Sequence, residues 1–138
     1  MLRSFFHFTL MSLIVAGLAG CASEPEHFTE GETIHGYATW YGAEYQGHVT
    51  SNGETFDMHQ LTAASRHLPF GTMVRVTNEM NNASVVVRIN DRGPWGDDKR
   101  IIDVSSAAAD ILKMKAAGII PVQLEILSLG AGARVRSE

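Results

Sequence analysis

The chain has 138 residues, with 15 acidic and 11 basic side chains and a net charge of −4 at pH 7. This acidic balance, with no basic stripe along the chain, excludes nucleic acid as an expected partner. The only cysteine is Cys21, which excludes an internal disulfide, so we expect stability to come from the packing of one domain.

The first 20 residues have the pattern of a secretory signal. Arg3 supplies a positive charge, and the apolar run over 5–19 is too short for a membrane span. Residues 18–21 read Leu-Ala-Gly-Cys, which resembles a bacterial lipobox, so we expect cleavage that leaves Cys21 as a lipidated N-terminus. A buried or free thiol is the alternative. Loss of residues 1–20, which include Arg3, leaves 118 residues and a net charge of −5.

The next segments are predicted to be a tether, a strand and a polar loop. Residues 21–33 are polar and contain four glutamates, which predicts a tether. Residues 34–41 alternate in the manner of a first strand, which ends at Gly42. Residues 47–57 are turn-rich and contain Glu54 and Asp57. These acids share a face only if the stretch is helical, and solvated surface charge is the alternative.

A hairpin and a dense turn follow. Residues 61–65 are small and weakly apolar. Apolar and polar residues alternate over 73–77, which predicts a strand. A polar loop joins this strand to residues 85–89, so the two segments form a predicted hairpin. The β-branched run over 85–89 predicts a central, buried strand. It stops at Asn-Asp-Arg-Gly-Pro, where Asp91 marks the end of the strand. Asp91 is a candidate site residue there, and an Asx-type turn is the alternative.

The last third of the chain predicts a strand, a helix and a final strand. Residues 101–104 are apolar around one acid, and Ser105 or Ser106 caps a helix over 107–114 that ends near Gly118. Residues 119–126 alternate into a last strand, and the glycine-rich, charged tail 130–138 is expected to be flexible. Short strands, one helix and frequent turns favour a mainly β fold, a small closed barrel.

Six ordered blocks of this sequence resemble the rare lipoprotein A family. They are residues 36–42, 50–58, 61–64, 68–72, 74–78 and 87–94, and the resemblance extends over 36–127. It implies a six-stranded double-psi β-barrel over 34–129. It also implies lytic cleavage of peptidoglycan glycan strands that lack stem peptides, with no cofactor. In such a reaction an acid protonates the glycosidic oxygen while the sugar's C6 hydroxyl attacks the anomeric carbon, and the product ends in a 1,6-anhydro sugar.

The family's functional positions correspond to Glu54, Asp57 and Asp91. Asp91 is the expected general acid, because partial desolvation at the mouth of a barrel favours a protonated carboxyl. Glu54 or Asp57 would stabilise positive charge on the sugar or position Asp91. Substrate contacts are expected from Trp40, Tyr41, Ser65, Arg92 and Trp95. Core packing is the alternative for the aromatic rings.

Ser65 stands where the family normally has a histidine, and a serine cannot supply a proton near neutral pH. A non-catalytic, expansin-like peptidoglycan-binding lipoprotein is therefore the alternative function, and a lipid-anchored partner for other envelope proteins is a third. The six histidines lack ligand spacing, so no metal is expected. The residue after Cys21 is Ala22, which favours sorting of the lipidated protein to the outer membrane over the inner one. We expect a monomer, without the glycan-binding domain found in many relatives, that faces the periplasm.

Overall fold

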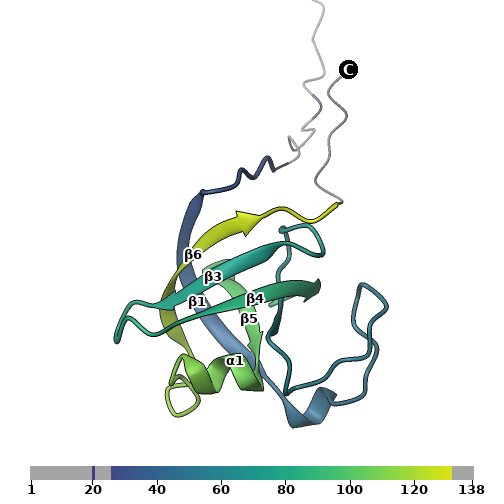
Figure 1. Cartoon of the computed structure of the whole chain (residues 1–138), viewed down its shortest axis with the longest axis vertical. Coiled ribbons are helices and arrows are strands. Elements are labelled where there is room, and N and C mark those ends of the chain that lie inside the picture. Colours follow the sequence, from purple (N-terminus) through teal and green to yellow (C-terminus); the bar gives the residue numbers. More distant parts are fainter. Residues whose placement is uncertain (1–19, 21–25, 132–138) are drawn as a thin grey trace, which may run out of the picture.

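The computed structural model describes residue 20 and residues 26–131. Six strands close into one barrel in the order β1-β5-β2-β4-β3-β6 (Figure 1). They are β1 (Thr33–Tyr41), β2 (Thr62–Ala64), β3 (Met73–Asn78), β4 (Ser84–Asp91), β5 (Arg100–Ser105) and β6 (Ile120–Ser128). The prediction of a mainly β, six-stranded barrel is confirmed. The expected signal peptide, Cys21 and residues 132–138 lie outside the described residues.

The barrel combines parallel and antiparallel pairs. β1 with β5 and β2 with β4 run parallel, while the other four neighbouring pairs run antiparallel. Every described strand has two neighbours, so no strand edge in this part of the chain is open to pair with another molecule.

The interior of the barrel is filled by alternate residues of the strands. On β4, Val85, Val87 and Ile89 are buried, as the β-branched run predicts. Gly36 on β1 permits a close approach here, because a Cβ atom on this residue would lie 2.8 Å from the side chain of Ile101. The core cluster draws buried residues from all six strands.

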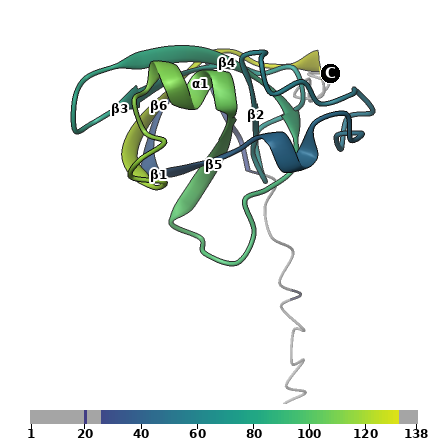
Figure 2. The ribbon, with the colours of Figure 1, turned by 90° about the horizontal axis from the view of Figure 1, so that it is seen from below.

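Two short helices complete the fold, η1 (Ala43–Tyr45) and α1 (Ser106–Ile111). α1 lies across one end of the barrel (Figure 2), and Ser105 caps it by accepting a hydrogen bond from the amide of Ala108. The prediction that this helix runs to Met114 and ends near Gly118 is wrong.

The early end of α1 has a local cause. Lys113 adopts a left-handed conformation with φ 56°, and the amide of Met114 donates to the carbonyl of Ala109 at 3.1 Å. This is the Schellman arrangement, which stops a helix and turns the next apolar residue inward. Leu112 and Met114 are both fully buried as a result.

The segment before β1 packs onto the barrel from Phe28 onward, closer than a tether over 21–33 implies. Phe28 contacts the core, and the amide of Gly31 donates to the carbonyl of Ile126 at 2.7 Å. At the other end, the amide of the buried Gly130 donates to Thr72 Oγ1 at 3.1 Å. No helix in the described part of the chain is long and apolar enough to cross a membrane.

Candidate functional site

A β-bulge sets the position of Asp91. Ala63 on β2 pairs with Ile89 on β4, but the next residue, Ala64, pairs with Asp91, so Asn90 is the extra residue. A bulge of this kind bends the strand and redirects the side chains that follow it. Asp91, rather than Asn90, therefore lies beside Ala64 at the end of β4.

A second carboxyl group lies on the other side of Ala64. Ala64 pairs with Asp103 on β5, and Asp103 in turn pairs with Thr39 on β1. Residues that are directly opposite in neighbouring strands share a face of the sheet. Thr39, Asp103, Ala64 and Asp91 therefore form one row across four strands, in which the small methyl group of Ala64 separates the two acids.

Three of these four residues, all except Thr39, face a pocket of about 430 Å³, which we call the Asp91 pocket. Both acids and Ala64 line it, together with Tyr41 and Tyr45 and with the loop residues 92–95 and Arg100. Two of its aromatic residues are largely exposed, Trp95 at 66% and Tyr45 at 49%, so the pocket has ring faces at its rim. Exposed aromatic rings beside polar groups suit sugar faces, which are apolar with polar edges.

Asp91 is held in place by three hydrogen bonds to one oxygen. Its Oδ1 accepts from the amide of Ser51 at 2.9 Å, from the hydroxyl of Ser51 at 2.7 Å and from the amide of Arg92 at 2.9 Å. Ser51 belongs to the polar loop over 47–57, so this loop is bound directly to the end of β4. The carboxylate thus fixes the loop and lines the pocket at the same time.

Asp103 has a different environment, and the sequence did not identify it as a site residue. Burial raises its pKa to about 6, and the negative charges of Asp91 and Glu44 act in the same direction. Its Oδ1 is buried without a hydrogen-bond partner among the described residues, as are Tyr41 Oη and Thr39 Oγ1. Since buried polar atoms are normally paired, Asp103 Oδ1 and Tyr41 Oη, which belong to residues that line the pocket, are available for a bound hydroxyl group or water, while the Thr39 side chain acts on Asp103 itself.

Tyr41 both packs in an apolar cluster and lines the pocket, the two roles that the sequence left open. It is 7% exposed and stacks on Phe56 with ring centroids 4.6 Å apart, so it is part of a small apolar cluster. It also lines the Asp91 pocket, where burial raises the pKa of its hydroxyl far above the usual range. The hydroxyl is therefore neutral and can donate a hydrogen bond. Tyr45, another residue that the sequence did not single out, packs edge-on against it at 5.8 Å.

Glu54 is committed to an ion pair. Arg88 donates to both of its carboxylate oxygens, at 2.6 and 2.9 Å, and Asn52 and Asn90 add bonds at 3.0 and 3.2 Å. The hydrogen bond from Arg88 is the main reason that the pKa of Glu54 falls to about 2. Glu54 lies outside the set of residues that line the Asp91 pocket, and it fastens the 47–57 loop to β4.

Asp57 also lies outside this set. Its Oδ1 accepts a hydrogen bond from the amide of His59 at 3.0 Å, which is the geometry of an Asx turn. The structure therefore brings together Asp91, Tyr41, Arg92 and Trp95 from the predicted site, and it places Glu54 and Asp57 in the loop that supports them.

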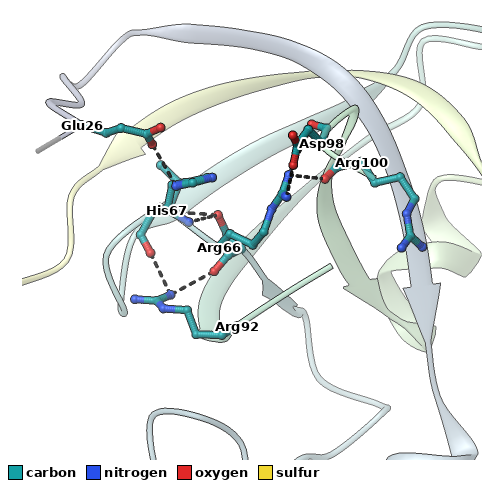
Figure 3. Close-up of polar contacts among 8 residues, drawn as sticks. Glu26, Arg66, His67, Arg92, Asp98 and Arg100 are labelled. Atoms are coloured by element: carbon teal, nitrogen blue, oxygen red, sulfur yellow. Dashed lines mark hydrogen bonds and ion pairs between the residues drawn. The ribbon is translucent and has the colours of Figure 1, made fainter. Parts of the chain in front are cut away.

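Arg92 lines the pocket, but its guanidinium group is occupied by the neighbouring turn (Figure 3). Nη1 donates to the carbonyls of Ser65 and Leu68 at 3.1 and 3.0 Å, and Cζ lies 3.7 Å from the ring centre of Phe70. Two further arginines hold the loop that carries Trp95. Arg100 donates to the carbonyl of Trp95 at 2.5 Å, and Arg66 bonds Asp98 at 2.7 Å.

Ser65 and Trp40 do not line the Asp91 pocket. Ser65 follows Ala64, so its side chain points to the other side of the sheet. There its Oγ accepts from the amide of Leu68 at 3.2 Å, beside another pocket of about 400 Å³ between the 26–34 segment and the barrel. Trp40 packs against the core, and Lys115 Nζ lies 5.2 Å from its ring centre. The described residues contain no cluster of three side chains able to hold a metal ion.

The mixed closed barrel, with two acids facing a pocket at a β-bulge, has the architecture of a double-psi β-barrel. A family model described as lytic transglycolase matches residues 33–124, and the chain belongs to this family. The resemblance to the rare lipoprotein A family is confirmed by curated relatives. The endolytic peptidoglycan transglycosylase RlpA of Campylobacter jejuni is 50% identical over 101 residues, which are 73% of this chain and 36% of that protein. The protein of the same name from Vibrio cholerae is 46% identical over 112 residues, 81% of this chain and 41% of that protein.

The chain thus spans less than half the length of these relatives. Solved structures support the fold. The Streptomyces papain inhibitor matches with a TM-score of 0.58 and 22% identity, over 72% of this chain and 97% of that chain. A Clavibacter michiganensis expansin matches with a TM-score of 0.58 and 24% identity, over 73% of this chain and 53% of that chain.

Proposed function

We propose that this protein is an endolytic peptidoglycan transglycosylase that cleaves glycan strands lacking stem peptides and leaves 1,6-anhydro ends. The observation that carries the proposal is the pair of acids, Asp91 and Asp103, that face one pocket across Ala64. Relatives with this activity in their names are 46–51% identical to the chain over the barrel, which supports the same chemistry here.

The geometry of the pair suits this reaction. One strand, β2, lies between the strands that carry the acids, so two interstrand spacings place their backbones roughly 10 Å apart, with room for a sugar between the carboxyl groups. One carboxyl donates a proton to the leaving oxygen and the other accepts the proton of the C6 hydroxyl. Because the substrate supplies its own nucleophile, no water has to fit between the acids, and the usual spacing rule for paired glycosidase carboxylates does not apply.

The exposed rim suits a polymer rather than a small ligand. Trp95 and Tyr45 present partly exposed rings on residues that line the pocket. A glycan strand can lie along such a rim with sugar rings on either side of the scissile bond, which is what cleavage within a strand requires. The hydroxyl of Tyr41, a residue that lines the pocket, has no hydrogen-bond partner among the described residues and can bond a sugar hydroxyl.

The test is product analysis on purified sacculi whose stem peptides have been removed. We expect mass spectrometry to detect 1,6-anhydro ends, and we expect Asp91→Asn to reduce their formation by about 100-fold or more. Asp110→Asn is the matched control, because Asp110 is exposed on α1 and pairs with Lys115. Release of strands with ordinary reducing ends would contradict the proposal. Binding to sacculi without any cleavage would favour the expansin-like alternative instead.

We also propose that the protein is a monomer anchored by lipid at Cys21, facing the periplasm from the outer membrane. Residues 18–21 and the alanine after Cys21 support this proposal. Cells fed a clickable palmitate analogue should label the wild-type protein, whereas Cys21→Ser should remain unlabelled and appear in the soluble fraction. Equal labelling of both proteins would contradict the anchor.

A further inference from the structure

We propose that Asp103 is the proton donor of this site and that Asp91 is the proton acceptor, which exchanges the role that the sequence assigns to Asp91. The inference rests on the proposed function, because it assigns roles within the same pocket. It starts from a difference in surroundings between two acids that are both register partners of Ala64.

Asp103 has the surroundings of a proton donor. Its Oδ1 is buried and has no partner among the described residues, so a proton on this carboxyl is free to be given to a ligand. The groups around it are Thr39 and Tyr41 from β1, Glu44 from η1, Asp91 from β4, Arg92 just after β4 and Arg100 from β5, while β2 contributes only Ala64.

Burial of the Asp103 carboxyl outweighs the effects of its neighbours, among which the Thr39 hydroxyl and Arg100 favour the charged form, whereas Asp91 and Glu44 oppose it. Two of them are acids and Tyr41 is neutral, while the guanidinium groups of Arg92 and Arg100 are engaged with backbone carbonyls. Burial therefore raises the pKa of Asp103 to about 6. A donor needs such a value to be protonated in part at the pH of the cell envelope.

Asp91 has the surroundings of an acceptor. Three hydrogen bonds converge on its Oδ1, two of them from Ser51, and two of the three donors are backbone amides, which can only donate. Oδ1 is therefore occupied as an acceptor of hydrogen bonds. Its Oδ2 has no hydrogen bond within residues 26–131, so this oxygen is available to take a proton while Oδ1 stays bound.

The chemical step is balanced with these two residues alone. Asp103 gives its proton to the glycosidic oxygen as the bond between that oxygen and the anomeric carbon breaks. The C6 oxygen of the same sugar forms a bond to the anomeric carbon and passes its proton to Asp91 Oδ2. The products are a strand with a new hydroxyl end and a strand with a 1,6-anhydro end, and proton exchange with solvent restores both acids.

The experiment compares Asp103→Asn and Asp91→Asn on two substrates. On peptide-free glycan strands we expect both variants to lose about 100-fold or more in rate. The second substrate is an oligosaccharide of the same sugars with a dinitrophenyl leaving group, which departs without protonation. On it we expect Asp103→Asn to recover to within about tenfold of the wild-type rate, because only the donor is missing, whereas Asp91→Asn stays inactive.

A pH profile gives a second readout. Wild-type kcat/KM on glycan strands should fall above about pH 6, and this fall should be absent for Asp103→Asn on the dinitrophenyl substrate. Recovery of Asp91→Asn instead of Asp103→Asn would overturn the assignment. Absence of anhydro products from the wild-type protein would count against the proposed function itself, which keeps the two failures distinct. Circular dichroism of both variants checks that the barrel is folded.

Discussion

Asp91 and Asp103 lie on opposite sides of Ala64, each as its register partner from a neighbouring strand. Neither pairing is local in sequence, because Ala64 is more than twenty residues from Asp91 and almost forty from Asp103. The space between the two carboxyl groups is open because the side chain between them, that of Ala64, is a single methyl group. The size of this side chain therefore controls access to both acids.

Replacement of Ala64 by a larger residue should block the pocket. Ala64→Leu adds three carbon atoms between the acids, and we expect glycan cleavage to fall at least tenfold with a rise in KM. Overpacking next to Phe56 should also reduce the free energy of unfolding by about 1–3 kcal/mol. Ala117→Leu, at an exposed position in the turn after α1, is the matched control and should leave both quantities nearly unchanged. Unchanged KM in a folded Ala64→Leu protein would show that glycan does not enter between the acids.

Trp95 should contribute to binding and not to stability. Its side chain is 66% exposed at the pocket rim, so Trp95→Ala removes little buried surface. We expect sedimentation with sacculi to weaken about tenfold while the thermal midpoint shifts by less than about 2 °C. Met80→Ala serves as control, because Met80 is 73% exposed in the loop between β3 and β4 and outside the pocket. Equal binding of both variants to sacculi would show that Trp95 does not contact the glycan.

Glu54 should stabilise the fold in a pH-dependent way. Its folded pKa of about 2 lies below the ordinary 4.5, so its contribution is present above about pH 4.5 and is lost as the pH falls toward 2. Because the side chain is 40% exposed, solvent screening limits the contribution to about 1 kcal/mol. Urea denaturation of Glu54→Gln should show this deficit at pH 7 and little deficit near pH 2.5.

The control for Glu54 is Glu125→Gln. Glu125 pairs with Arg75 at 2.6 Å and has a similarly exposed side chain, but it lies on β6 rather than in the 47–57 loop. We expect only Glu54→Gln to reduce glycan cleavage, because only Glu54 secures the loop from which Ser51 reaches Asp91. A similar loss of activity in both variants would contradict this supporting role.

Asp103 should oppose stability at neutral pH. Its folded pKa of about 6 lies above the ordinary 3.8, so the folded state holds this proton more tightly and stability declines as the pH rises from about 4 to 6. Asp103→Asn removes the charge, and at pH 7 we expect it to increase the free energy of unfolding by about 2 kcal/mol. At pH 4 the two proteins should differ little. If Asp103→Asn were less stable than the wild-type protein at pH 7 while Asp110→Asn kept wild-type stability, burial of Asp103 would not oppose folding as we expect.

Arg92 should act mainly through the turn that it holds. Arg92→Lys keeps the charge but loses the planar contact with Phe70 and at least one of the two carbonyl bonds. We expect the free energy of unfolding to drop by about 2 kcal/mol in urea denaturation. Arg75→Lys, in an exposed ion pair, should change it by less than about 0.5 kcal/mol. If the two variants were equally stable, the turn would not depend on Arg92.

The sequence predicts those strands whose own residues carry the pattern. The run over 85–89 and the alternation over 73–77 and 119–126 are strong enough to predict β3, β4 and β6. β2 has only three residues, Thr-Ala-Ala, and its conformation comes from pairing with β4 and β5. Such pairing depends on contacts distant in sequence, which periodicity does not reveal.

The site residues also divide into those that a local sequence pattern predicts and those that depend on contacts distant in sequence. Asp91 was predicted because a turn follows it directly, whereas Asp103 was hidden inside an apolar run. Strand alternation was the available signal, since it turns Asp103 away from its buried neighbours Ile102 and Val104. The ion pair of Glu54 with Arg88 joins residues 34 positions apart, so no spacing rule could have found it.

The row of Thr39, Asp103, Ala64 and Asp91 draws one residue from each of four neighbouring strands, and pairing between strands that are distant in sequence brings them together. No single strand carries more than one of these residues, so the row forms only when the four strands pair. Glycan cleavage is thus a probe of the intact domain. Its loss under heat or denaturant should coincide with global unfolding, and a ligand held by these four strands should protect the whole barrel against it.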